Sequence, residues 1–275
     1  MRVFLLLTFL LTSLWGEEDP LLKGPGLSIG LISENSSIAA GEPFVVGIDI
    51  KHFPGFHTYW KNPGMVGVGT SIEWTLPNGF TASEISWPYP EKSFMAQYPC
   101  HGYERDVTLL VTITPPAKIE EKTVRLSAKT IWMCCAKGCF PGYETFEISL
   151  PVTKAAQKDQ STAARFKKAR TEFPTSDDSI LATLVSKIDA KTIEVLFKGL
   201  GKIKLEEMYF FSSDKQISSD QKQSFIREED GSILLSVPRS EYSPEKATTL
   251  TGVLLAEKRH LMIEAKMEKP TTEEK

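Results

Sequence analysis

The sequence predicts an all-β protein, in which a β-sandwich is followed by a second, smaller β-rich domain and a short helix joins the two. Three observations support this prediction: segments of alternating apolar and polar residues, turn signals such as Pro-Gly, Asn-Gly and Pro-Pro between them, and one stretch rich in Ala, Lys and Gln. A chain of 275 residues with 41% hydrophobic residues can form one large or two ordinary cores.

The first sixteen residues are typical of an export signal. Arg2 supplies a positive charge, residues 3–11 are mostly apolar, and Gly16 provides a small residue at the expected cleavage site. The apolar run is much shorter than the ~20 residues that a membrane-spanning helix needs. We therefore expect residues 1–16 to be a signal peptide and the mature chain to be exported, soluble and not itself membrane-spanning. A net charge of −3 argues against a nucleic-acid partner.

The first domain is expected over residues 26–153. In residues 42–51, the apolar side chains of Phe44, Val46, Ile48 and Ile50 share one parity, which is typical of a half-buried strand. Similar alternation predicts further strands over 107–114, 124–131 and 146–152. Several short strands separated by turns indicate a β-sandwich.

The composition changes after residue 153. Ala163, Phe166 and Ala169 recur at helical spacing, and Phe173-Pro174 ends the pattern. We expect a helical linker over residues 154–177, with a disordered linker as the alternative. Short strand signals return over 178–268 and predict a second sandwich-like domain, and residues 269–275 form a charged tail.

The main chemical signal is a cluster of cysteines. Three of the four lie in the six residues Cys134-Cys135-Ala136-Lys137-Gly138-Cys139. A bridge that closes a loop of about five residues gives only ~2 kcal/mol in the chain-entropy model, so Cys135–Cys139 would be a poor structural staple. Strained and exposed bridges are the labile, catalytic ones, so we predict that Cys135 and Cys139 exchange electrons. Lys137 lies between them and is either a solvated loop lysine or a group that favours a thiolate.

The other two cysteines admit several interpretations. A Cys100–Cys134 bridge would close about 35 residues and give nearer ~4 kcal/mol, so these two are our first candidates for a structural disulfide. Alternatively, Cys134 replaces Cys135 as the partner of Cys139.

A metal site is the third interpretation of the cluster. The cysteines, His101 and Met133 are ligands that suit Cu(I) or Zn. The chain lacks the usual Cys-x2-Cys and His-x3-His pairs, so we assign no metal ligand and predict no cofactor. We expect His57 to be a packed or surface histidine, because three clustered thiols are not the pattern of a cysteine protease.

Three further motifs identify a family resemblance. Residues 55–64 read Gly-Phe-His-Thr-Tyr-Trp-Lys-Asn-Pro-Gly, residues 70–77 read Thr-Ser-Ile-Glu-Trp-Thr-Leu-Pro, and Cys139 is followed by Phe-Pro-Gly. Over about residues 27–152 the chain resembles the N-terminal periplasmic domain of the DsbD/ScsB thiol:disulfide interchange proteins. The resemblance implies an immunoglobulin-like sandwich in which Cys135 and Cys139 are the exchanging pair and Cys139 forms mixed disulfides with partners.

The resemblance also implies partners and a location. Electrons would come from a membrane-embedded DsbD/CcdA-like reductase or a thioredoxin-like domain, which we expect on separate polypeptides, and would pass to exported disulfide-containing proteins in the periplasm. Family members shield the pair with an aromatic cap; its nearest counterpart here is the segment 91–98 with Phe94, and Tyr59 is a second candidate shield. The predicted function is therefore that of a protein-disulfide reductase component. The alternative is a non-enzymatic copper-handling, assembly or interaction protein with structural disulfides.

Overall fold

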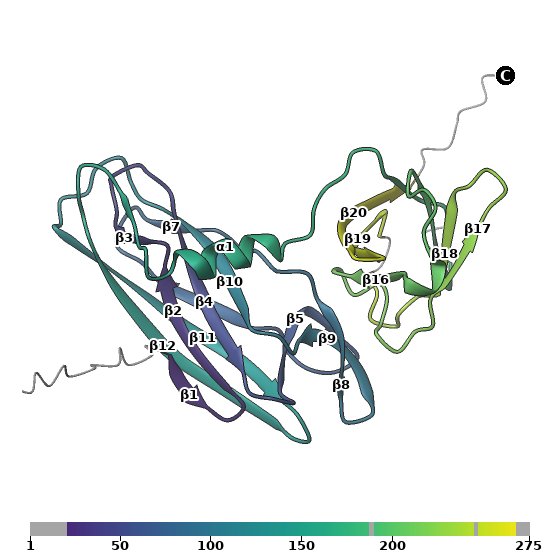
Figure 1. Ribbon diagram of the computed structural model, residues 1–275, viewed down its shortest axis with the longest axis horizontal. Helices are drawn as coiled ribbons and strands as arrows, with labels where there is room; N and C mark the ends of the chain where they lie inside the picture. Colours follow the sequence, from purple (N-terminus) through teal and green to yellow (C-terminus); the bar gives the residue numbers. More distant parts are fainter. Residues whose placement is uncertain (1–20, 187–189, 245–246, 268–275) are drawn as a thin grey trace, which may run out of the picture.

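The computed structural model describes residues 21–186, 190–244 and 247–267, which form two β-rich bodies joined by the segment that follows the helix α1 (Figure 1). The predicted signal peptide and the charged tail lie outside the described residues. Among the described residues, every helix is too short or too polar to cross a bilayer. The all-β prediction is confirmed, with one α-helix between the two sets of strands.

The first domain consists of two main antiparallel sheets. The first has the order β1-β2-β4-β10-β7, and the second has the order β12-β11-β5-β9-β8, with β6 paired to β11. The strands of the first sheet are β1 (Leu22–Gly24), β2 (Leu27–Ser33), β4 (Phe44–His52), β10 (Val107–Thr114) and β7 (Thr81–Ala82). Those of the second are β12 (Cys139–Pro151), β11 (Thr123–Cys135), β5 (His57–Gly64), β9 (Tyr98–Tyr103), β8 (Glu91–Met95) and β6 (Ser71–Thr75).

The core of the first domain follows the alternation in the sequence. Phe44, Val46, Ile48 and Ile50 of β4 are all buried, and the side chains of β10 with the same parity pack beside them. The opposite sheet contributes large side chains such as Trp60 and Trp132. Because successive side chains of a strand point to opposite faces, each strand has an inner face in this core and an outer face.

The linker is fixed to the first domain. The helix α1 (Ala163–Thr171) buries Phe166 and Ala169 against Ile32 and Leu110. It is shorter than the predicted helical stretch, because residues 157–158 form the strand β13 (Gln157–Lys158) instead and pair with β3 (Asn35–Ser37). Apolar contact begins only at Phe166, so the polar residues before it gain nothing from a helical face.

The second domain is a single seven-stranded sheet with the order β16-β19-β20-β14-β15-β18-β17. It is antiparallel except that β14 and β20 are parallel. Its elements are β14 (Leu181–Leu184), β15 (Thr192–Lys198), η1 (Leu205–Glu207), β16 (Tyr209–Ser212), β17 (Ser224–Arg227), β18 (Ile233–Pro238), β19 (Thr249–Ala256) and β20 (Arg259–Met267). Its apolar core is separate from those of the sandwich.

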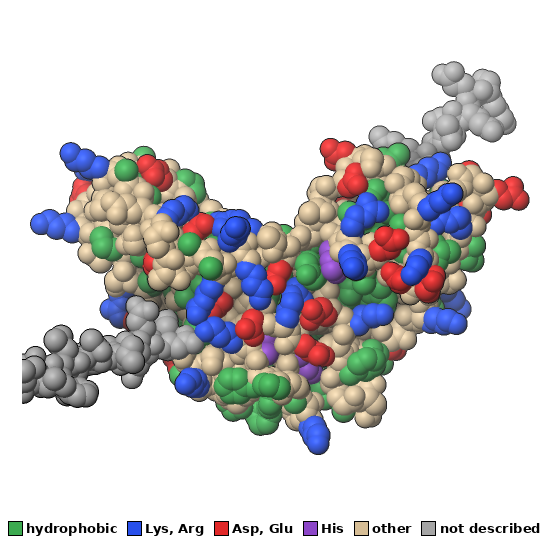
Figure 2. All heavy atoms as spheres, viewed as in Figure 1, with side chains coloured by type: hydrophobic (Ala, Val, Ile, Leu, Met, Phe, Trp, Pro, Cys, Tyr) green, Lys and Arg blue, Asp and Glu red, His purple; other side chains and the backbone are tan. Residues whose placement is uncertain are grey.

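The two domains also contact each other directly. Phe211 and Val253 of the second domain pack in the same apolar cluster as Trp60 of the first. The side-chain amide of Asn62 donates a buried hydrogen bond of 2.6 Å to the carbonyl of Ser212. At another point of the interface, the ring of Tyr89 stacks on His260 with centroids 3.6 Å apart. The interface thus includes an apolar cluster of its own. On the visible outer surface, acidic and basic side chains are interspersed (Figure 2).

Candidate redox site

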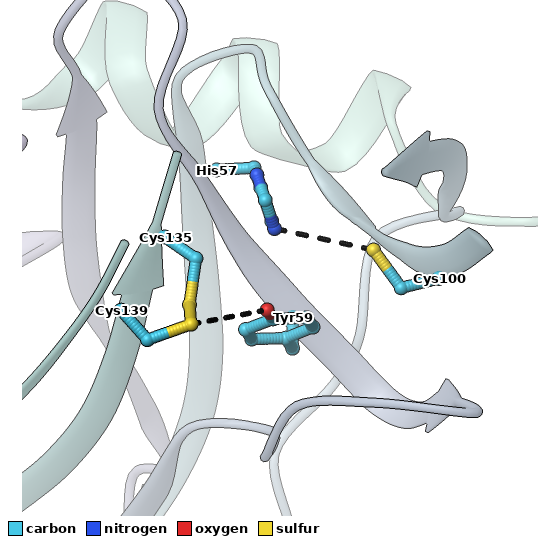
Figure 3. Close-up of a disulfide and its surroundings, with 5 residues drawn as sticks. All are labelled: His57, Tyr59, Cys100, Cys135 and Cys139. Carbon is cyan, nitrogen blue, oxygen red and sulfur yellow. Dashed lines mark hydrogen bonds between the residues drawn. A yellow bond between two sulfur atoms is a disulfide. The ribbon is translucent and has the colours of Figure 1, made fainter. Parts of the chain in front are cut away.

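Both cysteines of the predicted pair lie at the tip of the β11–β12 hairpin. Cys135 is the last residue of β11 and Cys139 the first of β12, and the two are directly opposed across the hairpin with Cα atoms 4.2 Å apart. Between them the amide of Ala136 donates a hydrogen bond of 2.9 Å to the carbonyl of Gly138. Opposed residues of an antiparallel pair point to the same face. The hairpin therefore brings the two sulfur atoms together, and they form a disulfide (Figure 3).

The two bonded cysteines differ in exposure. Cys135 is fully buried, whereas Cys139 is exposed to solvent. The hydroxyl of Tyr59 lies 4.0 Å from the Sγ of Cys139, within reach of a weak hydrogen bond to sulfur. Burial raises the pKa of Tyr59 well above its ordinary value, so the phenol keeps its proton at neutral pH and can donate it. A thiol from another molecule can reach Cys139 but not Cys135.

The buried cysteine of the pair, Cys135, lies in an apolar cluster on the face of the sheet that points away from the sandwich core. Cys135, Tyr59 and Cys100 form this cluster, and Val66, Met95 and Met133 pack against it. His57 is the cross-strand partner of Cys135 in β5, and Tyr59, two residues further on, points to the same face. The spacing within β5 thus places an imidazole and a phenol beside the disulfide.

The predicted Cys100–Cys134 bridge is absent, and both cysteines are free thiols. Cys134 precedes Cys135 in the same strand, so it points to the opposite, inner face and packs with Trp60 and Trp132. Cys100 lies on the outer face with Cys135, so the sheet itself separates the two thiols. Burial raises the pKa of each thiol to about 11, so both stay protonated at neutral pH.

His57 is closer to the site than the sequence suggested. It is only 2% exposed, its ring packs edge-on against Tyr59 at 5.1 Å, and its Nε2 lies 3.9 Å from the Sγ of Cys100. Figure 3 shows His57 and Tyr59 between the disulfide and Cys100. Burial lowers the pKa of His57, so the imidazole is neutral at pH 7. The pairing of β5 with β11, which positions His57, leaves no signal in the sequence.

His101 lies on the opposite face of the sheet from Cys100 and Cys135. It is the neighbour of Cys100 in β9 and therefore points to the inner face, where its Nε2 lies 2.9 Å from the hydroxyl of Tyr209. Among the described residues, no group of three or more histidine, cysteine, aspartate or glutamate side chains is arranged to hold a metal ion.

The exposed side of the site is a groove of about 720 Å³. Phe56, Phe94, Phe140 and the loop 136–138 line it, and the rings of Phe56 and Phe140 are 6.1 Å apart. Phe94 is 61% exposed and borders the groove, and its role as a cap stays a prediction. Met95, at the end of β8, packs on the cluster around Cys135, and the sequence did not single it out because the pairing of β8 is a tertiary feature.

The two free thiols should be dispensable for the disulfide. We expect Cys100→Ser and Cys134→Ser each to keep the Cys135–Cys139 bridge, because neither sulfur is bonded to it. Cys134→Ser should lower the free energy of unfolding by about 1–3 kcal/mol, because it places an unpaired hydroxyl in the core. Cys100→Ser should cost less, since His57 can accept the new hydroxyl proton. Non-reducing peptide mapping and urea unfolding measure the two effects; loss of the bridge in either variant would contradict the assignment.

The first domain is thus a β-sandwich that carries a solvent-accessible disulfide at the tip of one hairpin. Residues 31–151 match the family model described as "Thiol:disulfide interchange protein DsbD, N-terminal". Over this segment the match confirms the resemblance to a DsbD/ScsB-type N-terminal domain, and the predicted immunoglobulin-like sandwich class is confirmed as well.

The fold of both domains together is also known. The crystal structure of the N-terminal periplasmic domain of ScsB from Proteus mirabilis matches with a TM-score of 0.65 and 13% identity, covering 90% of this chain and 97% of that one. At this identity the likeness concerns the fold. A titin A168–A169 structure gives a TM-score of 0.22, which supports no comparison. A search of curated proteins found no match.

Proposed function

We propose that this protein is a periplasmic thiol–disulfide interchange protein, which passes electrons from a membrane reductase to exported partner proteins through Cys135 and Cys139. The observation that carries the proposal is the difference in exposure between two bonded cysteines: Cys139 is open to solvent and Cys135 is buried beside it. The match of residues 31–151 to a thiol:disulfide interchange family supports the same chemistry.

The geometry supports a separate role for each sulfur. In the dithiol form, the Cys139 thiolate attacks one sulfur of a partner disulfide, forms a mixed disulfide and releases one partner thiolate. Cys135, opposite it in the hairpin, then attacks the Sγ of Cys139, which restores the Cys135–Cys139 bond and releases the second partner thiolate. Two electrons have then passed to the partner. Tyr59 can stabilise a developing thiolate on Cys139 through its O–H group.

The other half of the cycle needs an electron donor. A thioredoxin-like domain, or a membrane-embedded reductase of the DsbD/CcdA type, would present a thiolate to the oxidised protein, and only Cys139 is accessible to it. The apolar groove beside Cys139 gives such a partner a surface to contact. An export signal over residues 1–16 would place the protein in the same compartment as its partners.

The reduction potential of the pair tests this proposal. The protein is equilibrated in graded glutathione buffers, its thiols are trapped by alkylation, and each cysteine is mapped by mass spectrometry. We expect the Cys135–Cys139 couple to titrate between roughly −180 and −270 mV, the range of exchanging dithiols. A couple below about −300 mV would behave as a structural disulfide and would refute the proposed function.

A further inference from the structure

The buried cluster around Cys135 is covered by two separate segments of the first domain. The β8–β9 hairpin contributes Met95, and the loop that follows β5 contributes Val66. In that loop the backbone of Gly67 lies so close to Tyr59 that an added Cβ would sit 2.1 Å from the ring. The two segments belong to different hairpins, and they meet where β5 pairs with β9, with Gly64 opposite Cys100.

One hydroxyl of the second domain joins the two segments. The amide of Met65, in the loop after β5, donates a hydrogen bond of 3.0 Å to the Oγ of Ser219. The same hydroxyl donates its proton to the carbonyl of Pro99, the residue before Cys100 in β9. Ser219 is buried, and Gly64 approaches it closely enough that an added Cβ would lie 2.3 Å from its Oγ. This hydroxyl therefore bridges both parts of the cover.

Other contacts attach the same hairpin to the second domain. The hydroxyl of Tyr209 lies 2.9 Å from the Nε2 of His101 in β9, and the Nζ of Lys92 in β8 lies 5.0 Å from the centroid of the Tyr209 ring. Both strands of the β8–β9 hairpin thus rest on Tyr209, while Ser219 ties the hairpin to the loop after β5.

We propose that Ser219 is a positioning residue, through which the second domain holds this cover closed over Cys100 and Cys135 so that exchange is confined to Cys139. The consequence for exchange rests on the proposed function. The closing of the cover does not, because it can be measured on Cys100, which takes no part in the disulfide. Within the first domain the two segments meet through the pairing of Gly64 with Cys100, and the Ser219 oxygen adds a second link between Met65 and Pro99.

Labelling of the two free thiols tests the proposal in the oxidised, full-length protein. Cys100 and Cys134 are equally buried, but Cys100 lies under the cover whereas Cys134 lies in the sandwich core on the opposite face. We expect Ser219→Ala to raise the rate at which iodoacetamide labels Cys100 about tenfold or more, because losing one or two net hydrogen bonds changes a local opening equilibrium by such a factor. Labelling of Cys134 should stay within about twofold of wild type.

One further variant completes the design. Ser218→Ala alters the neighbouring side chain, whose hydroxyl makes no hydrogen bond within the described part of the chain, and should leave both labelling rates unchanged. Equal acceleration of Cys100 and Cys134 would show general destabilisation, and unchanged Cys100 labelling in Ser219→Ala would show that the cover does not depend on Ser219. Either result overturns the proposal, while the reduction potential judges the proposed function separately.

Discussion

Replacing Cys139 with serine should abolish disulfide exchange, whereas replacing Cys135 with serine should stop it halfway. Without Cys139, the remaining thiol of the pair is fully buried and cannot reach a partner, so the rate of exchange should fall to the uncatalysed background. Without Cys135, Cys139 can still attack a partner disulfide, but nothing in the hairpin resolves the product. We therefore expect Cys135→Ser to accumulate a stable mixed disulfide with its partner.

Glutathione disulfide serves as a defined partner for this measurement. The reduced protein is mixed with it, the reaction is quenched by acid, and intact mass spectrometry follows the glutathione adduct over time. Cys135→Ser should keep one adduct on Cys139, the wild type should show it only transiently, and Cys139→Ser should show none there. Cys134→Ser is the matched control, because it removes the adjacent thiol on the other face of the strand. A lasting adduct on Cys135 in the Cys139→Ser variant would reverse the assigned roles.

Acid should destabilise the protein well above the pH at which carboxylates titrate. All four histidines have lowered pKa values, chiefly because burial penalises the charged imidazole, and those of His52, His101 and His260 fall to about 4. In the unfolded chain each would titrate near 6.5. The unfolded state therefore binds more protons below pH 6.5, so stability is complete above that value and is lost as the pH falls from about 6.5 towards 4.

The expected size of this effect is large for a domain of ordinary stability. Each buried histidine contributes a slope of up to about 1.4 kcal/mol per pH unit, and the partly exposed His52 and His260 contribute less than His101. Urea unfolding at pH 7, 6 and 5 measures the slope above the main carboxylate range. His101→Gln should flatten it, because His101 is almost fully buried between the domains. A free energy of unfolding that does not change between pH 7 and 5 would contradict this account.

The fold could be predicted largely because its cores are built from local patterns. The alternation in residues 42–51 and 107–114 reports directly which side chains of β4 and β10 face the core. The linker was harder to predict, because β13 forms only by pairing with β3, which lies more than a hundred residues away. Propensity alone cannot show that a polar segment will gain a cross-strand partner.

The same distinction between local pattern and tertiary pairing applies to the site. Cys135 and Cys139 could be paired from sequence because they are four residues apart with a glycine between them. The role of Cys100 could not be predicted from sequence. The free energy of loop closure favours a bridge to Cys134, but that argument does not consider which face of the sheet each cysteine lies on. Tertiary pairing of β5, β9 and β11 decides which thiols share a face and places His57 beside Cys135, whereas Met95 comes from β8 and Ser219 from the second domain. Met95 and Ser219 have no neighbouring motif that marks them, and the motif of residues 55–64 contains His57 without showing that it lies opposite Cys135.

The alternation of Cys134 and Cys135 across β11 has a consequence for the order in which the protein must mature. In an unfolded chain, bridges from Cys139 to either cysteine close loops that differ by one residue, and their entropic costs differ by only roughly 0.2 kcal/mol. The entropy of loop closure therefore hardly distinguishes the two bridges. Only after β11 has formed does Cys134 point into the sandwich core, away from Cys139. Oxidation that precedes folding should give a mixture of isomers, whereas folding in a reducing buffer followed by oxidation should give one product.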